Sequence, residues 1–242
     1  MAEAKIPRWT RGYWAGLHLL SAANLARVGY AAEQEMLAGN RTESTLLQHR
    51  ACIIGSIFTS VAFLETTANE FFGDATDSPP TLTGLQRPVG VISGALSGLD
   101  EEAIRRVGNL WSLGVPRRAS YSILEKFEIA VALADREPFD RGAKPYQEVK
   151  LLVMLRNEWI HYEPAWMAEH EERAPRGIET LEGHFPFAPR NKDIEKFSLH
   201  HCISHGCAEW GVLSAVEFAD HFFRKMGVRP NFEHWRSKIV TR

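Results

Sequence analysis

The stretch LLVMLRNEWIHYEP, residues 151–164, reads as the end of a helix that is apolar almost all the way round, yet it contains Arg156, Asn157 and His161. At about 100° per residue, with Val149 at zero, Arg156 falls near −20°, inside the apolar arc. Asn157 and His161 fall near 80° and 120°, where they can touch. A guanidinium held among apolar neighbours has its N–H donors fixed in direction, which is suited to binding an anion.

A second charge interrupts the apolar segment ACIIGSIFTSVAFLETTANEFF in the same way. With Ile54 at zero, Glu65 falls near 20°, in the middle of the apolar stripe. Because an unpaired charge on a core face is costly, we predict that Glu65 pairs with Arg156. Two compatible interpretations stay open: a structural ion pair that holds two helices in register, or an arginine fixed at the wall of a cleft where it meets an anion.

The segment RNEWIH resembles the signature of the HEPN superfamily of all-α domains, many of which are ribonucleases. Arg156, Asn157 and His161 match its arginine, small polar residue and histidine, with four positions between arginine and histidine. SVAFLETTANEFF resembles the acidic second helix of these proteins, and YSILEKFEIAVAL followed by LLVMLRNEWIHYEP resembles the third and fourth. The resemblance covers about residues 42–164.

The resemblance implies metal-independent cleavage of single-stranded RNA by the ribose 2′-hydroxyl, which leaves a cyclic phosphate. His161 is then the general base or acid, because the ordinary pKa of histidine lies near neutrality. Arg156 stabilises the charge that develops on phosphorus. Asn157 orients the imidazole or reaches a phosphate oxygen, and Glu65 holds the arginine.

The positions of Arg156 and His161 on the helix suggest a second copy of the chain. The two are about 140° apart on the wheel, so one straight helix does not aim both at one small target. HEPN sites are commonly composite and form at a two-fold interface, which predicts a homodimer with both motif helices at the seam.

Five to six helices are predicted, with no convincing strand, and the fold class is therefore an all-α helical bundle. The whole chain, 1–242, is interpreted as a single helical domain, in which a C-terminal helix packs on the HEPN-like core. Two long irregular loops, 73–99 and 164–198, are predicted from their prolines and glycines. The expected helices are 12–38, 42–72, 100–113, 117–135, 145–163 and 199–226.

Composition gives no bulk attraction to nucleic acid. The 242 residues are 45% apolar and carry a net charge of −2, so RNA must be held by a local patch. An odd count of three cysteines favours a reducing compartment, and the cytoplasm is expected. No signal peptide is predicted, and the apolar run 51–64 is short for a membrane span, so no membrane partner is expected.

Other motifs in the sequence give weaker indications of a metal, cofactor or RNA site. HHCISHGC, residues 200–207, supplies metal-ligand residue types from one helix start only, so no metal is expected and the histidines are predicted to be exposed. No Walker or dinucleotide loop is present, and no cofactor is expected. The pairs Arg105–Arg106 and Arg117–Arg118 are either solvated or in contact with RNA phosphates.

The first functional hypothesis is therefore a HEPN-type endoribonuclease of a toxin, defence or stress system, with an antitoxin or regulatory protein as a further partner. The alternative is a non-catalytic HEPN-like binding or interaction module that keeps the motif for structure.

Overall fold

Regular structure in the described part of the chain is entirely helical. The computed structural model describes residues 12–77, 96–118, 121–162, 177–187 and 198–242. These residues form seven α-helices, two short 3₁₀ helices and no strand, which confirms the all-α prediction. The helices are α1 (Ala15–Leu37), α2 (Glu43–Asp77), α4 (Glu101–Ser112), α5 (Val115–Arg118), α6 (Ile123–Leu133), α7 (Tyr146–Ile160), η1 (Ile178–Leu181), α8 (His205–Met226) and η3 (Glu233–Lys238).

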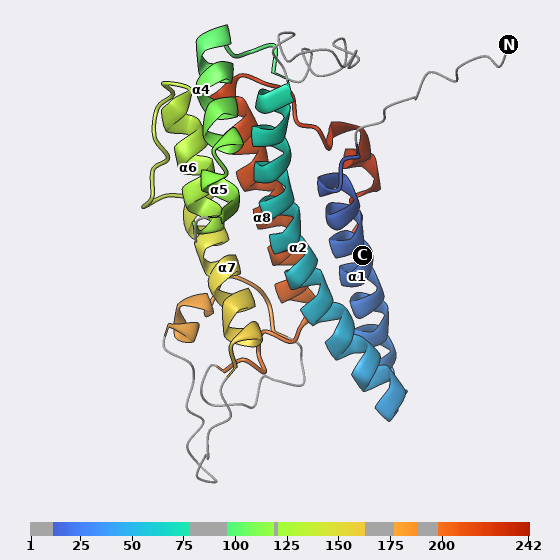
Figure 1. Ribbon diagram of the computed structural model, residues 1–242. Helices are drawn as coiled ribbons and strands as arrows, with labels where there is room; N and C mark the ends of the chain where they lie inside the picture. Colours follow the sequence, from blue (N-terminus) through green and yellow to red (C-terminus); the bar gives the residue numbers. More distant parts are fainter. Residues whose placement is uncertain (1–11, 78–95, 119–120, 163–176, 188–197) are drawn as a thin grey trace, which may run out of the picture.

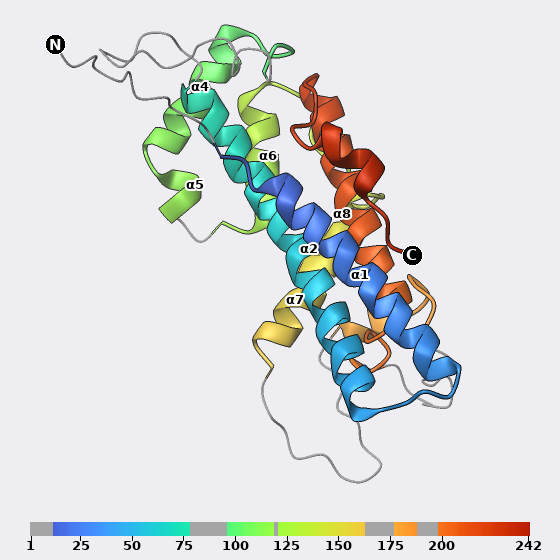
Figure 2. The ribbon, with the colours of Figure 1, turned by 90° about the vertical axis from the view of Figure 1, so that its right-hand side faces the viewer.

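The long helices α2 and α8 lie in the middle of the bundle (Figure 1). Helix α1 packs along α2 and also contacts α8, while α4, α6 and α7 cover the opposite side. In the view turned by 90°, α1 lies in front of α2 and α8 runs beside them (Figure 2). Helix α7 contacts both central helices, so both help to position the candidate motif.

Small residues bring α1 close to α2. The buried face of α1 is mostly alanine and glycine, spaced at three and four residues. A Cβ on Gly29 would lie 2.7 Å from Cδ1 of Ile53, and the Ser56 hydroxyl donates to the carbonyl oxygen of Ala22 at 2.9 Å. These short side chains let the two backbones approach, and α1 therefore seals one side of α2.

Aromatic rings fill the contact between α6, α8 and α2. The ring of Phe127 lies edge-on to Phe218 and Phe222, with centroids 5.1 and 4.8 Å apart, and Phe71 meets Phe222 at 5.0 Å. Edge-to-face pairs of this kind contribute about 0.5–1.5 kcal/mol each beyond the area that they bury. Helix α6 is therefore fixed against the two central helices.

Helix α2 continues past Gly73 to Asp77, which shortens the loop predicted to begin at 73. Residues beyond 73 are held by α4, where Gly108 contacts the backbone of Ala75 and the Thr76 hydroxyl donates to the Gly108 carbonyl at 3.2 Å. A glycine inside a helix costs only about 1 kcal/mol relative to alanine, and Gly73 does not end α2. Residues 78–95 of that predicted loop lie outside the described residues.

Three other element bounds differ from the predictions. The segment 117–135 is divided into α5 and α6, and Ser122 begins α6 by accepting the N–H of Glu125. Helix α8 begins at His205, because the Ser204 hydroxyl accepts the N–H of Cys207. The loop 164–198 contains the short helix η1, and residues 164–176 and 188–197 of this loop lie outside the described residues.

The apolar run 51–64 lies inside α2, which is five residues longer at its C-terminal end than the predicted helix 42–72. Among the described helices, α2 alone is long and apolar enough to cross a bilayer by length and composition. Of its most apolar window, 56% is buried inside the bundle.

Candidate functional site

Helix α7 carries Arg156, Asn157 and His161 at its C-terminal end. Its buried face includes Val149, Leu152 and Leu155, and Arg156, the residue after Leu155, is half-buried. The Nε atom of Arg156 is buried and has no hydrogen-bond partner in the described part of the chain. A cationic donor is thus held at the edge of the core without an acceptor among the residues that the structure describes.

Asn157 and His161 lie at the last turn of the same helix. The backbone N–H of His161 donates to the carbonyl oxygen of Asn157 at 2.8 Å, and this bond closes the helix with His161 as its C-terminal cap. The histidine is exposed, whereas Asn157 is half-buried and lines a cleft between α6 and α7. The imidazole is therefore accessible to solvent.

Glu65 does not hold Arg156, contrary to the prediction. Its carboxylate pairs with the ammonium of Lys126 on α6, which also donates to Asn69 at 3.1 Å. The reason is register along α2. Helix α7 meets α2 at Phe58, whose ring lies 6.3 Å from that of Trp159. Glu65 is seven residues further along, about 10 Å up the helix, where α6 faces it instead.

Comparison with family models, with curated proteins and with solved structures gives no match. The functional assignment therefore depends on the residues and the geometry of α7. The structure brings Arg156, Asn157 and His161 together at one helix end and places Glu65 with Lys126.

The Glu65–Lys126 pair predicts an asymmetric effect on stability. The Lys126 side chain is 8% exposed and the Glu65 side chain 36%. Glu65→Ala leaves the buried Lys126 ammonium without its carboxylate and should lower the free energy of unfolding by about 2–3 kcal/mol. This loss is somewhat smaller than the loss expected for a fully buried pair. Lys126→Met leaves a carboxylate that water can reach and should cost about 1 kcal/mol or less. Urea unfolding of both variants measures the difference, and equal losses would contradict it.

A buried carboxylate at the other end of α7 was not predicted from the sequence. Glu148 is 3% exposed and accepts from Trp210 Nε1 at 2.5 Å, from Lys144 Nζ at 2.8 Å and from His184 Nδ1 at 3.0 Å. These contacts join α7 to α8 and to the segment that follows η1. Glu148 therefore anchors the first turn of the helix that carries the motif.

Acid should weaken this anchor. Burial by itself raises the pKa of Glu148, but hydrogen bonds from Lys144, Trp210 and His184 outweigh it, and the net pKa lies below its usual value. A carboxylate with a lowered folded-state pKa adds stability above its unfolded-state pKa, and loses it as the pH falls through the folded value. Glu148→Gln should therefore lower the free energy of unfolding at pH 7 and flatten its decline below about pH 4.3. Urea unfolding between pH 3 and pH 7 measures both effects, with exposed Glu182→Gln as the control.

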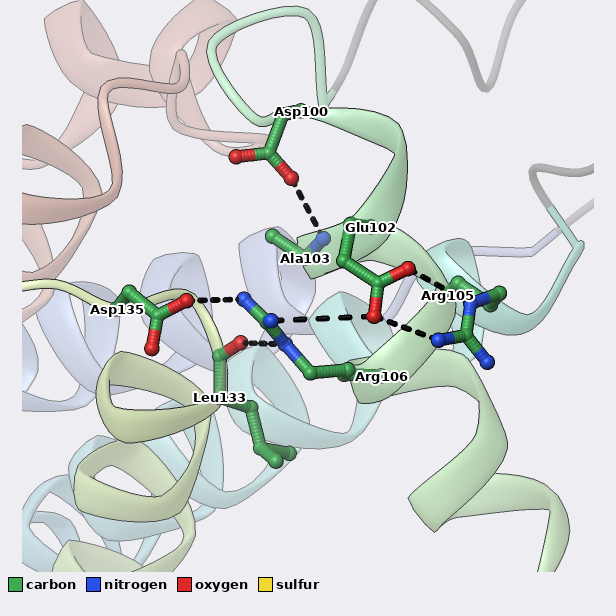
Figure 3. Close-up of polar contacts among 7 residues, drawn as sticks. All are labelled: Asp100, Glu102, Ala103, Arg105, Arg106, Leu133 and Asp135. Atoms are coloured by element: carbon green, nitrogen blue, oxygen red, sulfur yellow. Dashed lines mark hydrogen bonds and ion pairs between the residues drawn. The ribbon is translucent and has the colours of Figure 1, made fainter.

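The arginine pair on α4 is engaged by protein acceptors (Figure 3). Arg105 bonds the Glu102 carboxylate at 2.5 and 2.9 Å. Arg106 donates to the carbonyl oxygen of Leu133 at 2.8 Å and pairs with Asp135, which joins α4 to the end of α6 (Figure 3). This arrangement favours a structural role for both. The side chains of Arg117 and Arg118 lie outside the described residues.

In the histidine and cysteine run 200–207, His201 and His205 are buried, contrary to the predicted exposure, whereas His200 is exposed as predicted. His201 Nδ1 accepts the backbone N–H of Ser198 at 3.0 Å, and His205 Nε2 lies 2.9 Å from the carbonyl oxygen of Thr241. Cys202 and Cys207 are also buried. The described residues contain no group of three side chains that could hold a metal ion.

Proposed function

We propose that this protein is a metal-independent endoribonuclease of HEPN type, which cleaves single-stranded RNA beside the C-terminal end of α7. The observation that carries the proposal is the buried Nε–H of Arg156, which has no acceptor among the described residues. Leaving such a donor unpaired costs about 1–3 kcal/mol, or more when the group is charged. A phosphate oxygen bound at this position removes that cost and makes a charge-assisted hydrogen bond.

The alternative role of Arg156 is a structural ion pair, for which Glu65 was the expected partner. Glu65 is neutralised by Lys126, and Arg156 has no ion pair with any residue in the described ranges. A purely structural arginine at the edge of a core would be neutralised within the chain. The unpaired guanidinium is better explained by an anion that comes from outside.

In the proposed reaction, His161, Arg156 and Asn157 act at one phosphate of the RNA. The 2′-oxygen attacks phosphorus as His161 takes its proton, and the bond from phosphorus to the 5′-oxygen breaks. Arg156 stabilises the extra negative charge of the transition state, and the departing 5′-oxygen takes a proton from solvent. The products are a 2′,3′-cyclic phosphate and a free 5′-hydroxyl. Asn157 orients the imidazole or contacts a phosphate oxygen.

The site is composite in this proposal, with Arg156 from one chain and His161 from a second copy. The two side chains leave α7 about 140° apart, so they converge on one phosphate only across an interface. Exposed apolar residues flank the motif, since Ile160 is 49% exposed and Tyr162 57% exposed. These residues are suited to the seam of a two-fold dimer. Light scattering that gives a monomer at assay concentrations would contradict this arrangement.

The test is cleavage of RNA without metal. The full chain is incubated with single-stranded RNA in excess EDTA, and the product ends are identified by mass spectrometry. Cyclic phosphate and 5′-hydroxyl ends are expected, and RNA with 2′-O-methyl groups should stay intact because its nucleophile is blocked. No cutting in EDTA, or cutting of the methylated RNA, would contradict the proposal. RNA binding without cutting would favour the non-catalytic module.

A further inference from the structure

A cleft of about 510 Å³ lies between α6 and α7 and shares one residue with the proposed site. Asn157 lines it, together with Tyr146, Val153 and Met154. Its volume is within the range of small-ligand sites, about 300–1,000 Å³. The cleft is a separate feature from the phosphate site, because Arg156 is not among its lining residues in the described part of the chain.

The cleft leads toward His161. Lys150, Met154 and Asn157 line it and follow one another on α7 at spacings of four and three residues. Residues so spaced share one face of a helix, and His161 is the next position on that face. A nucleotide in the cleft therefore places its neighbouring phosphate near the exposed imidazole.

Several polar groups of the cleft are engaged within the protein. Arg141 makes two bonds to the Glu128 carboxylate, at 2.7 and 2.8 Å, and the Tyr146 hydroxyl donates to the same carboxylate at 2.9 Å. Glu125 accepts the backbone N–H of Ser122 at 2.6 Å and so caps α6. These groups are occupied within the protein.

Three polar side chains in the cleft have no such partner. Lys150, Asn157 and Glu158 line it and make no hydrogen bond or ion pair with any residue that the structure describes. An ionised glutamate accepts hydrogen bonds and donates none, so it repels phosphate and needs N–H donors. Such donors in RNA are found on the bases.

We propose that this cleft binds a guanine base next to the cleaved phosphate, which makes Glu158 a specificity-determining residue of the endoribonuclease proposed above. Guanine is the RNA base with two adjacent N–H donors, N1 and N2, on its Watson–Crick edge, and one carboxylate accepts both. The Asn157 amide donates to the neighbouring O6. Val153 and Met154 contact the face of the ring, and Lys150 contacts a backbone phosphate.

The experiment compares cleavage of short RNAs that differ at one position between guanine, adenine, cytosine and uracil. The wild-type chain should cut beside guanine about tenfold faster or more, since a polar site rejects bases that leave it unpaired. Glu158→Gln replaces one of the two acceptor oxygens with an NH₂ donor, and should reduce that preference about tenfold to a hundredfold. Glu217→Gln, an exposed carboxylate on α8, should leave it unchanged.

A second variant separates base recognition from general attraction. Lys150→Ala should slow cleavage of all the RNAs alike, by about threefold to tenfold, and reduce the dependence on salt by about one phosphate contact. Equal cutting beside all four bases, or a guanine preference that survives Glu158→Gln, would overturn the guanine site while leaving the nuclease in place.

Calorimetry decides the case in which the wild-type chain cuts no RNA. Guanosine 3′-monophosphate should then bind, adenosine 3′-monophosphate should bind about tenfold more weakly, and Glu158→Gln should abolish the difference. That result would remove the proposed function and keep the guanine site. Equal binding of the two nucleotides would remove the guanine site as well.

Discussion

Replacing His161 with alanine is expected to lower the rate of RNA cleavage by about 10²- to 10⁴-fold, the range that one general acid or base supplies. The side chain is exposed, and only its backbone N–H has a bond in the described structure, to Asn157. Its removal should therefore change the free energy of unfolding by no more than about 0.5 kcal/mol. A loss of rate without a loss of stability assigns the imidazole to the chemistry.

The control for His161 is a histidine that is exposed elsewhere. His234 lies in η3, an element that contacts α1, and His234→Ala should keep the full rate. Single-turnover cleavage and urea unfolding are measured on the same preparations of all three chains. Wild-type cutting by the His161 variant would remove the histidine from the reaction and leave any observed cleavage to another group.

The sequence predicted the position of α7 and most of its buried face. The apolar arc was centred on Val149, and Arg156 fell within it. In the structure Val149, Leu152 and Leu155 are buried, near 0°, −60° and −120°, so the buried face still includes the direction of Arg156. Arg156 is nevertheless only half-buried, because it lies near the end of α7, where the side chains of residues 156–162 are half-buried or exposed. The angle on the wheel predicts which face turns inward, but not how far along the helix the bundle covers that face.

The partner of Glu65 could have been found from a signal in α6. Lys126 lies between Ile123 and Ala130 at spacings of three and four, on the face that the structure buries. A buried lysine needs an acid as much as a buried glutamate needs a base. The sequence gives the angle of each charge around its own helix, but not the position along the axis at which two helices meet. That position places Lys126, and not Arg156, beside Glu65.

Two further features depend on contacts distant in sequence. The end of α2 is set by α4, through Gly108 against Ala75, and no residue near Gly73 signals this. The buried imidazole of His205 contacts the carbonyl oxygen of Thr241, 36 residues later. Local patterns thus predicted most helices and the motif end of α7, while burial and pairing needed the bundle.

Mixing two inactive variants is expected to restore activity if the site is composite. Arg156→Ala and His161→Ala should each be inactive alone. A mixed dimer keeps one site in which an intact Arg156 faces an intact His161. Random exchange makes half of the dimers mixed, and one of their two sites is whole, so about a quarter of the wild-type rate should return.

The size of the recovery distinguishes the arrangements of the site. If Arg156 and His161 of the same chain act together, no combination of the two variants contains a working pair, and mixing restores nothing. A mixture of Arg156→Ala with the double variant tests for contamination, because it contains no intact arginine and should stay inactive. Recovery near a quarter therefore requires that α7 of one chain supplies the guanidinium and α7 of the other the imidazole. The exposed Ile160 and Tyr162 then lie at the interface, and Ile160→Asp should abolish recovery and dimer together.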